Sequence, residues 1–129
     1  MTPTFRGGAN VAMKLPKARF EETLAFYRDT LGMDVVEETG TGIDGVVSRC
    51  ASVRLGPVKL WLDQVDNLAR ADLWLELFTD DVPLARRHLA ERGIHTQDEL
   101  EAFAPDMDAH WITNPAGIVH LVRAPRDDE

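Results

Sequence analysis

The chain has 129 residues, of which 44% are hydrophobic and one is a cysteine, and its formal net charge is -8. This length and apolar content suit a single domain that builds its own core without disulfides or a structural metal. An acidic chain without a basic patch does not favour a nucleic-acid surface, because phosphate binding needs clustered Lys and Arg. The apolar runs are far shorter than a membrane span, and Cys50 has no partner for an intrachain disulfide. We therefore expect a cytoplasmic protein that binds neither nucleic acid nor membrane.

The first recognisable unit is a strand followed by a helix. Residues 10–15 alternate polar and apolar side chains, which predicts a strand with one apolar face. Beyond Pro16, apolar residues recur at spacings typical of an amphipathic helix: Phe20, Leu24, Tyr27 and Leu31. Pro16 suits the first turn of this helix, and Gly32 suits its left-handed end.

Three further strands complete the first half of the chain. Runs rich in apolar and β-branched residues cover residues 33–38, 46–55 and 58–63, with glycine-containing turns between them. Residues 64–71 carry no regular pattern and serve as a connection. The first half is therefore predicted as β-α-β-β-β.

The second half repeats this order less clearly. Residues 73–78 alternate as a strand, and Thr79-Asp80-Asp81 supplies cap candidates for a helix that ends at Gly93. A weaker strand is predicted over residues 94–100. Two last strands, 110–113 and 118–123, follow it.

The four residues between these last two strands are Asn114-Pro115-Ala116-Gly117, which is the chemistry of a type I turn. We interpret the whole pattern as an internal duplication within one domain that spans residues 1–129. Module 1 covers about residues 8–64, and module 2 covers about residues 71–124.

Two motifs make this pattern resemble the vicinal oxygen chelate superfamily, which contains glyoxalase I, extradiol dioxygenases, fosfomycin resistance proteins and bleomycin-binding proteins. Residues 26–32, Phe-Tyr-Arg-Asp-Thr-Leu-Gly, are similar to its Phe-Tyr-x-x-x-Leu-Gly helix end, and residues 114–117 are similar to its Asp-Pro-x-Gly hairpin. The resemblance implies an α+β fold in which two tandem βαβββ modules form a curled mixed sheet around a cleft, with the helices on the outer surface. It also implies pairing of modules within or between chains, so we expect a homodimer.

Strand alternation then predicts which side chains line the cleft. If the apolar residues of each strand face the helices, the first strand presents Asn10 and Lys14 to the cleft, and the fourth presents Trp61. The fifth strand presents Trp74 and Glu76 by the same rule. This wall combines aromatic rings with a few polar groups, as small-molecule sites usually do.

The last two strands add three candidates. His120 fits the inner face by its polarity, and together with Glu76 it is a candidate acid–base pair. His110 and Trp111 lie beside a loop and are candidates to close over a ligand, although Trp111 also suits the core.

Metal-using members of the superfamily place His, Gln or Glu at one slot on each inner strand. The first-strand slot here holds Asn10, and the fifth-strand slot holds Trp74. The last slot falls on Leu121, or on His120 if the hairpin is one residue shorter, and polarity favours His120. A catalytic divalent metal needs at least three good ligands, so we predict no metal and no other cofactor.

These features favour a small-molecule binding protein of the glyoxalase/bleomycin-resistance type, whose metal-free cleft holds an aromatic or hydrophobic ligand. The alternative is a superfamily enzyme of the lyase, isomerase or dioxygenase type, in which His120 and Glu76 act as acid and base or as ligands of a divalent metal. A third reading is an interaction module with a filled cleft.

Overall fold

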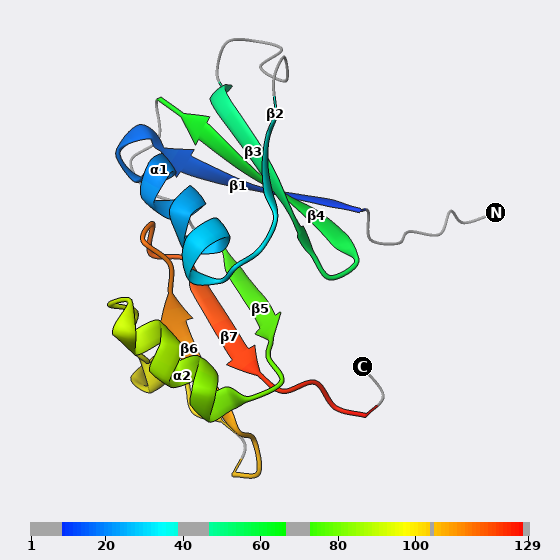
Figure 1. The fold of residues 1–129 in the computed structure, drawn as a ribbon, viewed down its shortest axis with the longest axis vertical. Coiled ribbons are helices and arrows are strands. Elements are labelled where there is room, and N and C mark those ends of the chain that lie inside the picture. The colour runs from blue at the N-terminus through cyan, green and yellow to red at the C-terminus, as the bar shows by residue number, and fades with distance from the viewer. Residues whose placement is uncertain (1–8, 39–46, 67–72, 104, 128–129) are drawn as a thin grey trace, which may run out of the picture.

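The computed structural model describes residues 9–38, 47–66, 73–103 and 105–127. These residues form an α+β fold with two β-sheets, sheet A from the N-terminal half and sheet B from the C-terminal half (Figure 1). In this view the two α-helices lie on the left, and sheet A lies above sheet B. None of the helices in the described ranges is both long and apolar enough to cross a membrane. The predicted fold class is confirmed.

Sheet A contains four strands in the order β1-β4-β3-β2. They are β1 (Asn10–Pro16), β2 (Val35–Glu38), β3 (Val47–Leu55) and β4 (Val58–Val65). β1 runs parallel to β4, and the other neighbours are antiparallel. A parallel pair needs a crossover between its strands, and here β1 is separated from β4 by the first helix and two strands.

The helix after β1 has two parts. α1 (Lys17–Ala25) is α-helical, and it continues into a single π-helical turn, η1 (Phe26–Thr30). Gly32 then adopts a φ of 69°, the left-handed conformation predicted for the helix end. The buried Phe20 and Leu24 share one apolar cluster with residues of β1 and β4, so the predicted amphipathic stripe is the face that packs on sheet A.

Sheet B contains three strands in the order β5-β7-β6. They are β5 (Trp74–Phe78), β6 (Ala109–Thr113) and β7 (Val119–Arg123). β5 pairs with β7 in parallel and β6 pairs with β7 in antiparallel, so the module repeats the parallel first-to-last pairing of sheet A. α2 (Val82–Glu91) follows β5, as α1 follows β1.

The β6–β7 turn has the predicted chemistry. The Gly117 N–H donates to the Asn114 carbonyl at 2.9 Å, and Gly117 has a φ of 83°. The Asn114 side-chain oxygen also accepts the N–H groups of Ala116 and Ile118. The turn therefore holds its own backbone donors.

The strand predicted over residues 94–100 is not formed. This segment contains a short 3₁₀ turn, η2 (Asp98–Leu100), although it still lies beside β6. The Gln97 N–H donates to the Trp111 carbonyl at 2.7 Å, and the Asp98 carboxylate accepts the Trp111 N–H at 2.9 Å. A side-chain carboxylate thus takes the place of the backbone carbonyl that a fourth strand would present.

The two modules share one hydrophobic core. Its buried cluster joins residues of sheet A and α1 with residues of sheet B and α2, including Ile112, Ile118 and Val122. At its centre the Tyr27 ring packs edge-on against Phe26 and beside the His120 ring, with centroid distances of 5.0 and 5.7 Å. The first helix of module 1 is therefore buried partly against module 2.

The start of α2 offers a test of the local fold. The Asp81 side chain accepts the Leu84 N–H at 3.0 Å and so caps the helix. We expect Asp81→Ala to lower the free energy of unfolding by about 1 kcal/mol. Urea denaturation measures this, with Asp80→Ala as the matched control because Asp80 is an exposed neighbour outside the cap position. Equal losses in the two variants would contradict the capping role.

Candidate functional site

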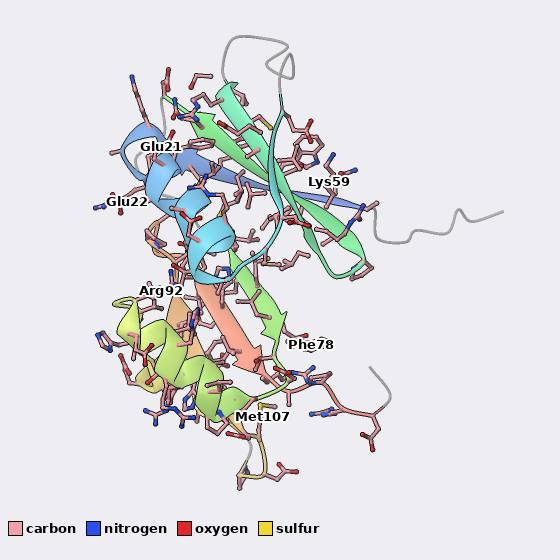
Figure 2. All side chains as sticks on the ribbon, in the orientation of Figure 1. Glu21, Glu22, Lys59, Phe78, Arg92 and Met107 are labelled. Atoms are coloured by element: carbon pink, nitrogen blue, oxygen red, sulfur yellow. The ribbon has the colours of Figure 1, made fainter. Side chains whose placement is uncertain are left out.

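Each sheet has one face toward the helices and one face away from them, which we call the open face. On sheet A the register pairs Ala12 with Trp61 and Lys14 with Asp63, and these residues alternate along their strands with the buried Met13 and Leu62. Asn10, Lys14 and Trp61 therefore share the open face. Figure 2 shows Lys59 and Phe78 extending to the right, away from the helices.

Hydrogen bonds and ion pairs connect the polar side chains on the open face of sheet A. The Trp61 indole N–H donates to the Asn10 side-chain oxygen at 2.9 Å. The Lys59 ammonium lies 4.1 Å from the centroid of the Trp61 ring and 3.5 Å from a Glu38 oxygen. These contacts hold the indole in one orientation, with a cation over its ring.

A second polar group on this face is centred on Asp63. Its two carboxylate oxygens accept from the Lys14 ammonium at 2.5 Å and from the Cys50 thiol at 3.0 Å. The Asp63 side chain is buried, whereas that of Lys14 is half exposed. Lys14 is thus already paired with a carboxylate.

The open face of sheet B is aromatic. Trp74 and Phe78 are each 50% exposed, although both are large apolar side chains. Trp74 meets Trp111 edge-on with a centroid distance of 5.2 Å, and Phe103 stacks on Trp111 at 5.3 Å. The Trp111 indole N–H donates to the Glu101 carbonyl at 2.9 Å. Trp111 therefore contacts Trp74 and is itself stacked on Phe103, and Trp74 presents its exposed surface to solvent.

One ion pair lies among these rings. The Arg123 guanidinium donates to the Glu76 carboxylate at 3.0 Å and lies 4.9 Å from the centroid of the Phe78 ring. Sequence reasoning missed Arg123, because the predicted register of β7 placed the odd-numbered positions on the wrong face. It also missed Phe103, which lies in a loop without any period.

His110 and Trp111 do not act together. His110 is paired in the sheet with Val122, a core residue, whereas Trp111 is paired with Leu121. Their side chains therefore point to opposite faces. The His110 Nδ1 lies 2.8 Å from an Asp98 oxygen, so this ring holds the segment before β6.

The predicted inward position of His120 is wrong. His120 is fully buried and pairs with Leu75 and Ile112, so it faces the helices, whereas Leu121 pairs with Glu76 on the open face. The β6–β7 turn keeps its full four residues. Counting four residues on from Gly117 therefore placed Leu121 on the open face correctly, whereas polarity had favoured His120. The structure does not bring His120 and Glu76 together as an acid–base pair.

Hydrogen bonds explain how a histidine is tolerated there. The Ile118 carbonyl can only accept, so the His120 Nδ1 donates to it at 3.0 Å. The Nε2 atom then accepts from the Tyr27 hydroxyl at 2.6 Å, and this hydroxyl accepts from the Asn114 amide at 3.2 Å. Burial lowers the pKa of His120 to about 4 and raises the pKa of Tyr27. Both groups are neutral parts of the core at neutral pH.

A family model for the glyoxalase/bleomycin resistance protein/dioxygenase superfamily matches residues 11–121. The chain belongs to this superfamily. The resemblance seen in the two sequence motifs is thereby confirmed, and a comparison with curated proteins gives no match.

Several solved structures share the fold. A glyoxalase family protein from Bacillus anthracis is 17% identical, with 98% of this chain and 100% of that one covered and a TM-score of 0.71. TnmS3, an antibiotic binding protein from Streptomyces sp. CB03234, is 20% identical, with 97% and 100% covered and a TM-score of 0.65. The trypanothione-dependent glyoxalase I of Leishmania major is 12% identical, with 93% and 87% covered and a TM-score of 0.69.

The side chains of this superfamily member do not fit a divalent metal at the expected slots. On the open faces these slots hold Asn10, Trp74 and Leu121, and the Asn10 oxygen already accepts the Trp61 indole N–H. Tryptophan and leucine carry no ligand atom for such an ion. In the part of the chain that the structure describes, no three His, Cys, Asp or Glu side chains gather into a possible metal site.

The burial of His120 predicts a pH dependence of stability. Its pKa is about 4 in the folded chain and about 6.5 in an unfolded one, so between these pH values the unfolded chain binds a proton that the folded chain does not. The free energy of unfolding therefore falls as the pH decreases through this window, by up to about 1.4 kcal/mol per pH unit from this residue.

We expect His120→Gln to reduce this slope when urea denaturation is measured from about pH 7.5 down to about pH 5. His95→Gln, at an exposed histidine, is the matched control and should retain it. The same slope in His120→Gln and in the unsubstituted protein would show that His120 does not titrate as a buried group.

Proposed function

We propose that this protein binds a small aromatic or hydrophobic molecule against its open faces and needs no metal to do so. The observation that carries the proposal is the exposed pair Trp74 and Phe78, which flanks the Glu76–Arg123 ion pair on sheet B. Exposed apolar surface rimmed by polar residues is typical of binding sites, and here two half-exposed aromatic side chains lie on the same face of one strand. The antibiotic-binding activity of TnmS3, a structural relative, is consistent with this proposal.

The arrangement of the rings suits a planar ligand. Trp74 is held by its edge-on contact with Trp111, so its position is fixed before a ligand arrives. Aromatic pairs contribute about 0.5–1.5 kcal/mol beyond the apolar area that they bury. The adjacent Glu76 and Arg123 could orient a ligand by hydrogen bonds to its polar substituents.

Sheet A would supply the second wall of the site. Trp61 and Lys59 offer another ring with a cation above it, and Asn10 and Lys14 lie along the same face. We infer that two copies of the chain associate as a cytoplasmic homodimer, in which the open faces would lie toward the second copy with the ligand between them. Sedimentation at micromolar concentration tests this part of the proposal.

The ligand proposal is tested by titrating the protein with a panel of planar aromatic compounds and antibiotics while tryptophan fluorescence is followed. Hits are then measured by calorimetry in Trp74→Ala and Phe78→Ala. We expect each variant to weaken binding by about tenfold, because a stacking surface is lost.

Leu100→Ala is the matched control for this experiment, because Leu100 is also an exposed apolar residue but belongs to η2. It should bind as the unsubstituted protein does. Unchanged affinity in both aromatic variants, or a panel that yields no saturable ligand, would refute the proposed function.

A further inference from the structure

A cavity of about 430 Å³ lies on the side of sheet B that faces the helices. Its base is formed by Leu77 of β5, Val122 of β7 and Leu89 of α2, all part of the hydrophobic core or packed against it. Leu31 and Met33, which follow η1, form a further wall. The cavity therefore lies where the two modules meet, and its volume is in the range of small-molecule sites.

This cavity is separate from the open face around Trp74, although Phe78 at the end of β5 also lines it. Leu77 and Val122 are paired with each other, and their neighbours Glu76 and Arg123 lie on the opposite side of the sheet. A molecule in the cavity would contact α2 and the end of η1, whereas a molecule on the open face would contact Trp74. Two distinct sites on one sheet can thus be distinguished by substitution.

The rim of the cavity at the start of α2 is acidic. Asp80 and Asp81 both line it, and both are exposed. The N-terminus of a helix generally favours an anion, but here the Asp81 carboxylate already accepts the Leu84 N–H at 3.0 Å. A second anion would meet two carboxylates at this end of the cavity, and a cation would be attracted by them.

Along α2 the lining becomes apolar and reaches His88 and Leu89. Ala85 lies one turn after Asp81, and the His88 Nε2 donates to the Thr30 carbonyl at 2.6 Å. The seven residue steps from Asp81 to His88 span about 10 Å of helix. The cavity thus has apolar walls along about 10 Å of α2. Its negative charge lies at one end, at Asp80 and Asp81.

We propose that this cavity binds a small organic cation. The cation has an apolar part about 10 Å long, and its ammonium group lies at Asp80 and Asp81. The walls bury the body, and the two carboxylates pair with the charge. This site is additional to the aromatic site on the open faces.

Three probes that share one apolar body separate the contributions: 4-phenylbutylamine, 4-phenylbutan-1-ol and 4-phenylbutanoate. Methionine methyl groups labelled with ¹³C report where they bind, since Met33 lines the cavity and Met107 lies elsewhere. We expect the amine to shift the Met33 signal saturably and to leave the Met107 signal in place. The amine should bind about fivefold more tightly than the alcohol, and the carboxylate more weakly still.

The double variant Asp80→Asn/Asp81→Asn removes both charges and keeps a side chain that caps helices well. It should bind the amine and the alcohol with equal affinity. Ala85→Phe should abolish the Met33 shift by filling the cavity, and Trp74→Ala should leave it unchanged.

Equal binding of all three probes by the unsubstituted protein, or a preference for the amine that persists in the double variant, would overturn the proposal. The proposal would also be overturned if none of the three probes shifted the Met33 signal. Neither result bears on the open-face site, because that site is tested with uncharged aromatic compounds through Trp74, which does not line the cavity.

Discussion

The hydrogen bond between Tyr27 and His120 joins the two halves of the molecule. Tyr27 comes from the first helix, His120 comes from the last strand, and Asn114 of the β6–β7 turn donates to the same hydroxyl. All three side chains are buried, and the Tyr27 hydroxyl finds both of its partners in module 2. This network connects the first helix to sheet B, and residues at the end of this helix, Thr30 and Leu31, line the cavity beside α2.

The orientation of His120 also decides which side chains lie on the open face of sheet B. Because β7 turns His120 toward the core, Leu121 and Arg123 lie on the other side with Glu76. Glu76 therefore meets a guanidinium and two aromatic residues instead of an imidazole. The Glu76–Arg123 ion pair can orient a ligand between the rings of Trp74 and Phe78. Acid–base chemistry at Glu76 would need a histidine beside it, and β7 turns its histidine to the other face of sheet B. The superfamily fold is retained while its expected metal slots hold residues suited to packing.

Local rules predicted most of the fold and part of the site. Alternation alone separated the two faces of β1, β4 and β5, and so placed Asn10, Trp61 and Trp74 correctly, because one side of each strand must pack on a helix. The prediction for His120 was wrong because its polarity was given more weight than the number of residues in the β6–β7 turn, which pointed to Leu121. Histidine can be buried when both ring nitrogens are bonded, and its partner Tyr27 is distant in sequence. Two other features depend on tertiary contacts, which local sequence patterns do not show. One is the hydrogen bond from the Trp111 N–H to the Asp98 carboxylate, and the other is the cavity between the modules.

The most direct test of this account is the titration of the individual histidine rings by NMR. The account predicts that the His120 ring stays neutral to about pH 5, with its proton on Nδ1 and a slowly exchanging Tyr27 hydroxyl beside it. A His120 ring that titrates near its usual value of about 6.5 would place the imidazole in solvent. That result would contradict the register of β7 and restore an acid–base group to the open face.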